Sequence, residues 1–370
     1  MDQKQLHRPA RSGGGALVYL AVLATVGLLW VARDLLIPFA VALMVWVLLR
    51  ALADAIGRLR WRGFALPAWS RIAAALAVVG LGGWLLVRIV ARNAVRVQEQ
   101  APAYQANLTA RLDRLAKDAG VDYKTQVEHL LGGGEFNFMG WVGTIAGELS
   151  SLAGSLGLVL IYLLFLLVEQ RYFPVKLASL VPDGTRRDEV AQLIARARSQ
   201  IESYVVIKFG ASALTGGLSW GVLAYLGVDF AAFWGLVIFL LNFIPTIGSI
   251  VGVLLPLALI LVQFPEPLRP FVIALVGLGA VQFLIGNVLE PRWTSGSLDL
   301  SPLALLLSLA VWGKMWGIVG MFLSVPLTVI LAIGCSEFPR TRWITVLLSE
   351  RGGPARVGRG RSVSQAPPSP

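Results

Sequence analysis

The feature that most constrains this chain is a series of long apolar runs between residues 16 and 333. Most approach the ~20 residues that a helix needs to cross a hydrocarbon core about 30 Å thick. The composition agrees, because 56% of the 370 residues are hydrophobic and 14% are charged, against roughly 45–50% and ~25% in soluble domains. The sequence predicts an all-α, polytopic membrane protein, with runs at residues 16–32, 35–49, 72–90, 152–168, 204–226, 231–263, 271–289 and 303–333.

Two of these runs, 231–263 and 303–333, are too long for one straight crossing. At 1.5 Å per residue each would reach roughly 45–50 Å. The first is interrupted by NFIPTIGS at residues 242–249 and the second by WGKMWG at residues 312–317. Proline removes a helix donor and glycine permits a turn. We therefore expect about six full crossings plus two re-entrant helical hairpins, with kinked full crossings as the alternative for both runs.

The two overlong runs share a sequence pattern that indicates an internal repeat. Residues 250–261 and 318–331 both read I-V-G, a short apolar spacer, then P-L-x-x-I-L. Each overlong run also follows one normal crossing, which gives repeat units at 203–263 and 271–333. If each hairpin returns to its own side, the second unit is inverted, as in many secondary transporters. The alternative is a phrase shared by chance between two kinked helices.

Loop charge sets the orientation. The loop at residues 50–71 holds five arginines against one aspartate, which marks it as cytoplasmic. Alternation then gives the remaining organisation: a cytoplasmic N-terminus at 1–15, transmembrane helices 1–3 at 16–90, an extracytoplasmic amphipathic helical segment at 91–144, transmembrane helix 4 at 145–168, a cytoplasmic interfacial helix at 169–202, the two-unit core at 203–333, and a basic, largely disordered cytoplasmic tail at 334–370.

Polar side chains at membrane depth are costly, so each one is a candidate for function. The candidate solute- or ion-binding residues lie at the two interruptions and near the end of run 271–289, namely Asn242, Pro245, Thr246, Gly248, Ser249, Gln282, Asn287, Glu290, Arg292 and Lys314. Those at the first interruption can bind solute hydroxyls or a cation, or can instead satisfy the backbone that the proline breaks.

The charged candidates each have two interpretations. Glu290 can bind a cation or a proton with Arg292 nearby, or the two can form an interfacial pair outside the bilayer. Lys314 can meet an anionic solute or extend toward the interface. We expect Lys208 to extend to the cytoplasmic face, and Asp229 to cap the helix that begins near residue 231.

Several classes of protein are excluded or disfavoured. The lone Cys335 and two histidines offer no disulfide and no cluster at metal-ligand spacing, and no phosphate-binding loop appears. We expect no cofactor, no metal and no enzymatic activity. The net charge of +11 fits basic cytoplasmic loops better than nucleic-acid binding. A secondary transporter is favoured, and a passive channel or scaffold is the alternative.

Motifs in the second half resemble the autoinducer-2 exporter family of bacterial inner-membrane permeases. They are YVVIK at 204–208, LNFIPTIGS at 241–249, GNVLEPR at 286–292, LSP at 300–302 and GIVG at 317–320. The resemblance covers about residues 16–335, mainly by pattern in the N-terminal half. Members often carry a proline-tyrosine-glycine variant of the first interruption, so the chain resembles a subgroup.

The resemblance implies a function and a cellular location. It implies a multi-pass protein of the bacterial inner membrane that exports the quorum-sensing signal autoinducer-2 or another small solute. Some members resemble sodium or lithium/proton antiporters, which gives a second expectation. The resemblance also implies homo-oligomers, pentamers among them.

Overall fold

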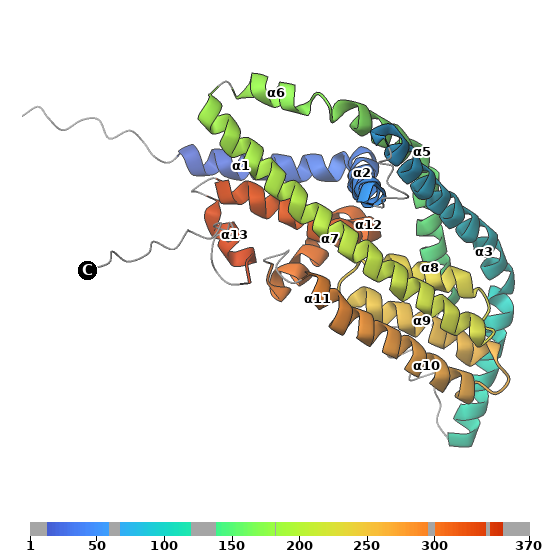
Figure 1. Ribbon diagram of the computed structural model, residues 1–370. Helices are drawn as coiled ribbons and strands as arrows, with labels where there is room; N and C mark the ends of the chain where they lie inside the picture. Colours follow the sequence, from blue (N-terminus) through green and yellow to red (C-terminus); the bar gives the residue numbers. More distant parts are fainter. Residues whose placement is uncertain are drawn as a thin grey trace, which may run out of the picture.

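Helices account for all the regular structure in the part of the chain that the computed structural model describes, residues 13–58, 67–119, 138–181, 183–294, 300–337 and 341–350. The predicted all-α class is confirmed (Figure 1). The elements are α1 (Gly13–Val31), α2 (Arg33–Arg58), α3 (Ala68–Ala119), α5 (Phe138–Glu169), α6 (Phe173–Leu180), α7 (Gly184–Tyr225), α8 (Ala231–Leu241), α9 (Ile247–Gln263), α10 (Leu268–Phe283), the π-helical segment η1 (Leu284–Leu289), α11 (Glu290–Thr294), α12 (Pro302–Glu337) and α13 (Arg342–Leu348).

Within these residues, five helices are long and apolar enough to cross a membrane, or six spans if one bent pair is counted. The bent pair joins Gly154–Glu169 to Phe173–Leu180 at 68°. Large apolar side chains such as Leu81, Val276 and Leu307 lie exposed on the outside of the bundle, where a bilayer would cover them. The chain is a multi-pass membrane protein. The five helices comprise Arg33–Arg58, Ala68–Asn93, Gly184–Tyr225, Leu268–Trp293 and Pro302–Ser336.

Two expected boundaries are absent, because a change from apolar to polar residues does not by itself end a helix. α3 continues for 52 residues to Ala119, so nothing separates the third crossing from the start of the predicted segment 91–144. α7 is one helix of 42 residues, which merges the predicted interfacial helix with the fifth crossing. It begins as expected, with Asp183 Oδ1 accepting a hydrogen bond from Thr185 N at 3.0 Å. Residues 1–12, 120–137 and 351–370 lie outside the described residues.

The first overlong run is folded back on itself. α8 has 11 residues and α9 has 17, and both are too short for a straight crossing. A Cβ on Gly252 would lie 3.4 Å from Ile238 Cγ1, although one continuous helix would separate these residues by about 21 Å. The reversal occurs at residues 242–246, where Thr246 has φ 62° and ψ −58°. α8 and α9 therefore form a helical hairpin (Figure 1).

The second overlong run reverses inside α12. Trp316 has φ −126° and ψ 15°, and Gly317 has φ 65° and ψ −146°, outside helical geometry. Trp312 Nε1 donates to Thr328 Oγ1 at 3.2 Å, whereas a continuous helix would place these residues about 24 Å apart. A Cβ on Gly320 would lie 2.0 Å from the Trp312 carbonyl oxygen, so only glycine permits this approach. Both overlong runs thus form hairpins.

Two apolar clusters pack against α7, one near its C-terminus and one around its middle. Leu223, near its C-terminus, packs with buried residues of α8, α9 and α10. Tyr204 and Val205, nearer the middle, pack with buried residues of α2 and α12. The hairpins touch at Phe243 and Phe322, whose ring centroids are 4.3 Å apart. The stretch of α7 between the two clusters lies beside the first hairpin and α10 (Figure 1).

Candidate solute- and ion-binding site

A line of polar side chains runs along α7 between the two apolar clusters. Lys208, Ser212, Thr215 and Ser219 recur at intervals of four, three and four, which places them on one helix face. Lys208 is 7% exposed and the other three are fully buried. We call these four residues the polar seam. They lie within the candidate membrane span Gly184–Tyr225.

An ion pair forms one end of the seam. Lys208 Nζ lies 2.6 Å from Glu290 Oε1, with side chains 9% and 23% exposed. Glu290 directly follows the π-helical segment η1, and its backbone N–H donates to Ile285 O. The wider turn of a π segment rotates the following residues around the helix axis, and such segments are frequent at functional sites. Lys208 was expected to extend to the cytoplasmic face; its side chain is instead buried and pairs with the half-buried Glu290 carboxylate.

The first hairpin meets the seam one turn further along α7. Asn242 Nδ2 donates to Ser212 Oγ at 3.0 Å, and both side chains are buried. Ser212 follows Lys208 by four residues, about 6 Å along the helix. α7 therefore brings together Asn242 and Glu290, two candidates that lie far apart in the sequence.

The other end of the seam contains polar atoms without hydrogen-bond partners among the described residues. Ser219 Oγ and Gln282 Nε2 are buried in this way. α10 runs antiparallel to α7, since Glu290 pairs with Lys208 and a Cβ on Gly277 would lie 2.9 Å from Val222 Cγ1. This register places Gln282 beside the stretch that ends at Ser219. A buried polar group without a partner costs roughly 1–3 kcal/mol.

The remaining candidates lie elsewhere. Thr246, Asn287, Arg292 and Lys314 are exposed, and Pro245 and Ser249 are half-buried. Gly248 has a structural role, because a Cβ there would lie 1.7 Å from the Leu241 carbonyl oxygen. In the described part of the chain, no three His, Cys, Asp or Glu side chains gather to hold a metal.

The expected role of Asp229 is wrong. The N-cap of α8 is Phe230, with φ 57° and no side-chain hydrogen bond. Asp229 Oδ2 instead accepts a hydrogen bond from Tyr104 Oη of α3 at 2.7 Å. Burial, and then this hydrogen bond, raise the pKa of Tyr104 above its usual value. The contact joins the extension of α3 beyond its apolar span to the start of the first hairpin.

Three functional candidates came only from the structure: Ser212, Thr215 and Ser219 of the polar seam. One sequence signal could have found them, the recurrence of polar residues every three or four positions inside the apolar run 204–226. The partner of each residue could not be found in this way, since pairing depends on the register between distant helices.

Together, the multi-pass helical fold, the two hairpins and the buried polar seam define the chain as a membrane transport protein. Comparison with known proteins identifies which kind. The model described as "AI-2E family transporter" matches residues 19–338, and the chain belongs to this family.

Three relatives support the assignment. The chain is 32% identical over 325 residues to the AI-2 transport protein TqsA of Escherichia coli K12, an alignment that covers 86% of this chain and 90% of that protein. It is 28% identical over 349 residues to a Haemophilus influenzae protein (91% and 95% coverage) and 35% identical over 243 residues to a Borreliella burgdorferi protein (64% of each). The names of these last two give transport as a provisional role and print no substrate.

Proposed function

We propose that the chain is a secondary-type transporter that exports a small polar solute, with autoinducer-2 or a related signal molecule as the first candidate. The observation that carries this proposal is the polar seam, which lies within a candidate membrane span between two apolar clusters. It includes the Ser219 hydroxyl, which has no hydrogen-bond partner among the described residues. A polyhydroxylated solute supplies the hydrogen bonds that this end of the seam lacks. The name of the relative TqsA supports the choice of substrate.

The hairpins provide the moving parts in this proposal. Each repeat unit is one long helix followed by a hairpin, and the second unit is inverted relative to the first. Their contact at Phe243 and Phe322 is a small aromatic one, which can separate at little cost compared with the two apolar clusters that pack against α7. Movement of one hairpin against the other then opens the seam alternately to each side. The proposal includes a homo-oligomer in the bacterial inner membrane with both termini in the cytoplasm.

A sodium or lithium/proton antiporter is the second candidate, and the ion pair favours it. The Glu290 carboxylate already binds a cationic group, the Lys208 ammonium, inside a membrane protein. A sodium ion, a lithium ion or a proton can replace the ammonium as the positive partner of the Glu290 carboxylate. Exchange of one such cation for another at this carboxylate would couple their movements across the membrane. The same exchange also provides ion coupling for solute export.

The test is transport by the purified protein in liposomes with labelled autoinducer-2 and an imposed proton or sodium gradient. Solute transport predicts saturable uptake with counterflow, which Asn242→Ala abolishes because the seam loses its contact with the first hairpin. Ser324→Ala is the matched control, since Ser324 is buried but bonds only the carbonyl of Met321 in its own helix. Cation-driven pH change without solute flux supports the antiporter. Flux without saturation or counterflow contradicts both.

A further inference from the structure

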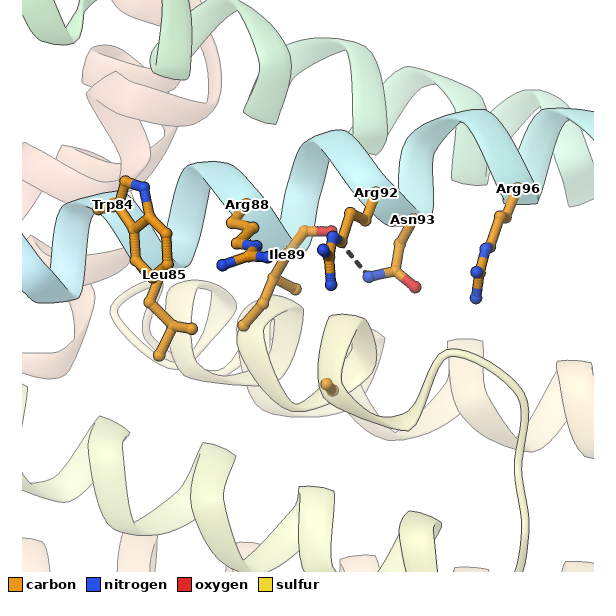
Figure 2. Close-up of a pocket in the computed structure, with 8 residues that line it drawn as sticks. Trp84, Leu85, Arg88, Ile89, Arg92, Asn93 and Arg96 are labelled. Atoms are coloured by element: carbon orange, nitrogen blue, oxygen red, sulfur yellow. Dashed lines mark hydrogen bonds between the residues drawn. The ribbon is translucent and has the colours of Figure 1, made fainter.

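A basic pocket lies between α3 and the start of α8. Its volume is about 810 Å³. α3 contributes Arg88, Arg92 and Arg96, with Trp84 and Leu85 at one end, and α8 contributes Ala232. Figure 2 shows the arginine side chains extending from one face of α3 into the space beside the neighbouring helix. The proposed function assigns no role to this pocket.

The three arginines concentrate positive charge along one edge of the pocket. They are spaced by four residues, so their Cα atoms follow one another at about 6 Å along the helix, and like charges at this spacing repel. The guanidinium of Arg88 lies over the Trp84 ring, 4.8 Å from its centroid. No salt bridge to a carboxylate neutralises any of the three within the described residues. An anion bound here relieves the repulsion.

The opposite wall also favours an anion. α8 begins at Ala231, its N-cap provides no side-chain hydrogen bond, and its first turn holds no acidic residue. The free N–H groups and the positive dipole end of a helix attract negative charge. Asp229, the acidic residue nearest in sequence, does not line the pocket, and its carboxylate is hydrogen-bonded to Tyr104.

The position of the pocket identifies the type of anion. The candidate membrane span of α3 is Ala68–Asn93, so Arg88 and Arg92 lie in its last turns and Arg96 lies just beyond it. Trp84 and Leu85, one turn deeper, are 54% and 50% exposed. Tryptophan is typical of the membrane interface, and arginine at the membrane surface attracts anionic lipid head groups. A small free anion would contact only the arginines, whereas a phospholipid would contact the arginines with its head group and the apolar end of the pocket with its acyl chains.

We propose that this pocket binds an anionic phospholipid, with its head-group phosphate held by Arg88, Arg92 and Arg96 and its acyl chains along Trp84 and Leu85. Bound lipid joins α3 to the start of the first hairpin at the membrane interface. The site is independent of the solute and of the coupling ion.

Lipid binding by the purified full-length protein tests this proposal. The delipidated protein in detergent is titrated with phosphatidylglycerol, with phosphatidylcholine or with inorganic phosphate, and bound molecules are counted by native mass spectrometry. We expect saturable binding of phosphatidylglycerol, about tenfold weaker binding of phosphatidylcholine, and no competition from millimolar phosphate. The triple variant R88Q/R92Q/R96Q is expected to lose at least about tenfold in affinity for phosphatidylglycerol.

The control is Arg171→Gln, which removes an exposed arginine that lies over an aromatic ring, Tyr172, away from the pocket. It is expected to change the affinity less than about twofold. If the triple glutamine variant fails to fold, the triple lysine variant keeps the charge and its retained preference for phosphatidylglycerol supports the proposal. Equal affinity of the wild type for both lipids, displacement by phosphate, or unchanged affinity in a folded triple variant overturns it.

Discussion

Removal of the Glu290 carboxylate is expected to destabilise the protein, because it leaves the Lys208 ammonium buried. The two charged atoms are 2.6 Å apart, and the Lys208 side chain is only 9% exposed. Truncating one partner of a buried ion pair costs about 3–5 kcal/mol. Because Glu290 is 23% exposed, we expect the Glu290→Gln substitution to lower the free energy of unfolding by about 3 kcal/mol, the lower limit of this range. Replacing both residues removes the stranded charge and restores much of this loss.

Thermal unfolding of the purified protein, followed by tryptophan fluorescence, measures these effects. Glu290→Gln is expected to lower Tm by at least about 5 °C. The double variant Lys208→Met/Glu290→Met is expected to recover more than half of the loss, with a coupling energy of about 1–3 kcal/mol. Glu169→Gln is the control, since its salt bridge with Lys176 is exposed, with side chains 52% and 60% accessible, and is worth at most about 1 kcal/mol. Equal effects of the two glutamate substitutions, or no recovery in the double variant, would show that the ion pair is not a buried, coupled unit.

Three further substitutions test the helix ends and hairpins. Gly248→Ala is expected to prevent accumulation of folded protein in membranes, because its Cβ would lie 1.7 Å from the Leu241 carbonyl oxygen. Gly210→Ala is the control, since its new Cβ would have open space around it. Fluorescence-detected size-exclusion chromatography measures both, and the control is expected to give a normal peak. Trp312→Phe removes the hydrogen bond to Thr328 that joins the arms of the second hairpin, and the same unfolding assay is expected to show a loss of about 1 kcal/mol. Asp183→Ala removes the side-chain cap of α7 and is expected to cost about 1 kcal/mol, whereas Asp183→Ser is expected to restore it.

The sequence was sufficient for the features that depend on length and on local backbone chemistry. Runs too long for a bilayer, each with an interruption that contains glycine, predicted the two reversals that the structure places at Thr246 and Gly317. Continuity was harder to predict. α3 changes from apolar to polar along its length and α7 changes from polar to apolar, both without interruption of the helix, so composition suggested boundaries that the helices do not have.

The candidate site was predicted only in part, for a different reason. Asn242 and Glu290 stood out as polar residues in or beside apolar runs, and both contact the polar seam. Lys208 was misjudged because its distance from the end of the run suggested a path to the interface. Its partner is 82 positions away, and the register of α7 against α10 that brings them together leaves no local trace in the sequence.

These two contacts attach separate elements to one helix, α7. The first hairpin is attached to α7 at Ser212, and the segment that follows α10 is attached to it at Lys208, one turn away. α7 is a single continuous helix over this stretch, so it transmits a displacement at one attachment to the other with little bending. Displacement of the first hairpin against α7 has to break the buried hydrogen bond between Asn242 and Ser212. Displacement of the segment that follows α10 has to break the ion pair between Lys208 and Glu290, about 6 Å away along α7. A polar solute can replace the hydrogen bond and a cation can replace the ion pair. The proposed transport cycle would therefore bind its solute and its coupling ion at the same level of α7.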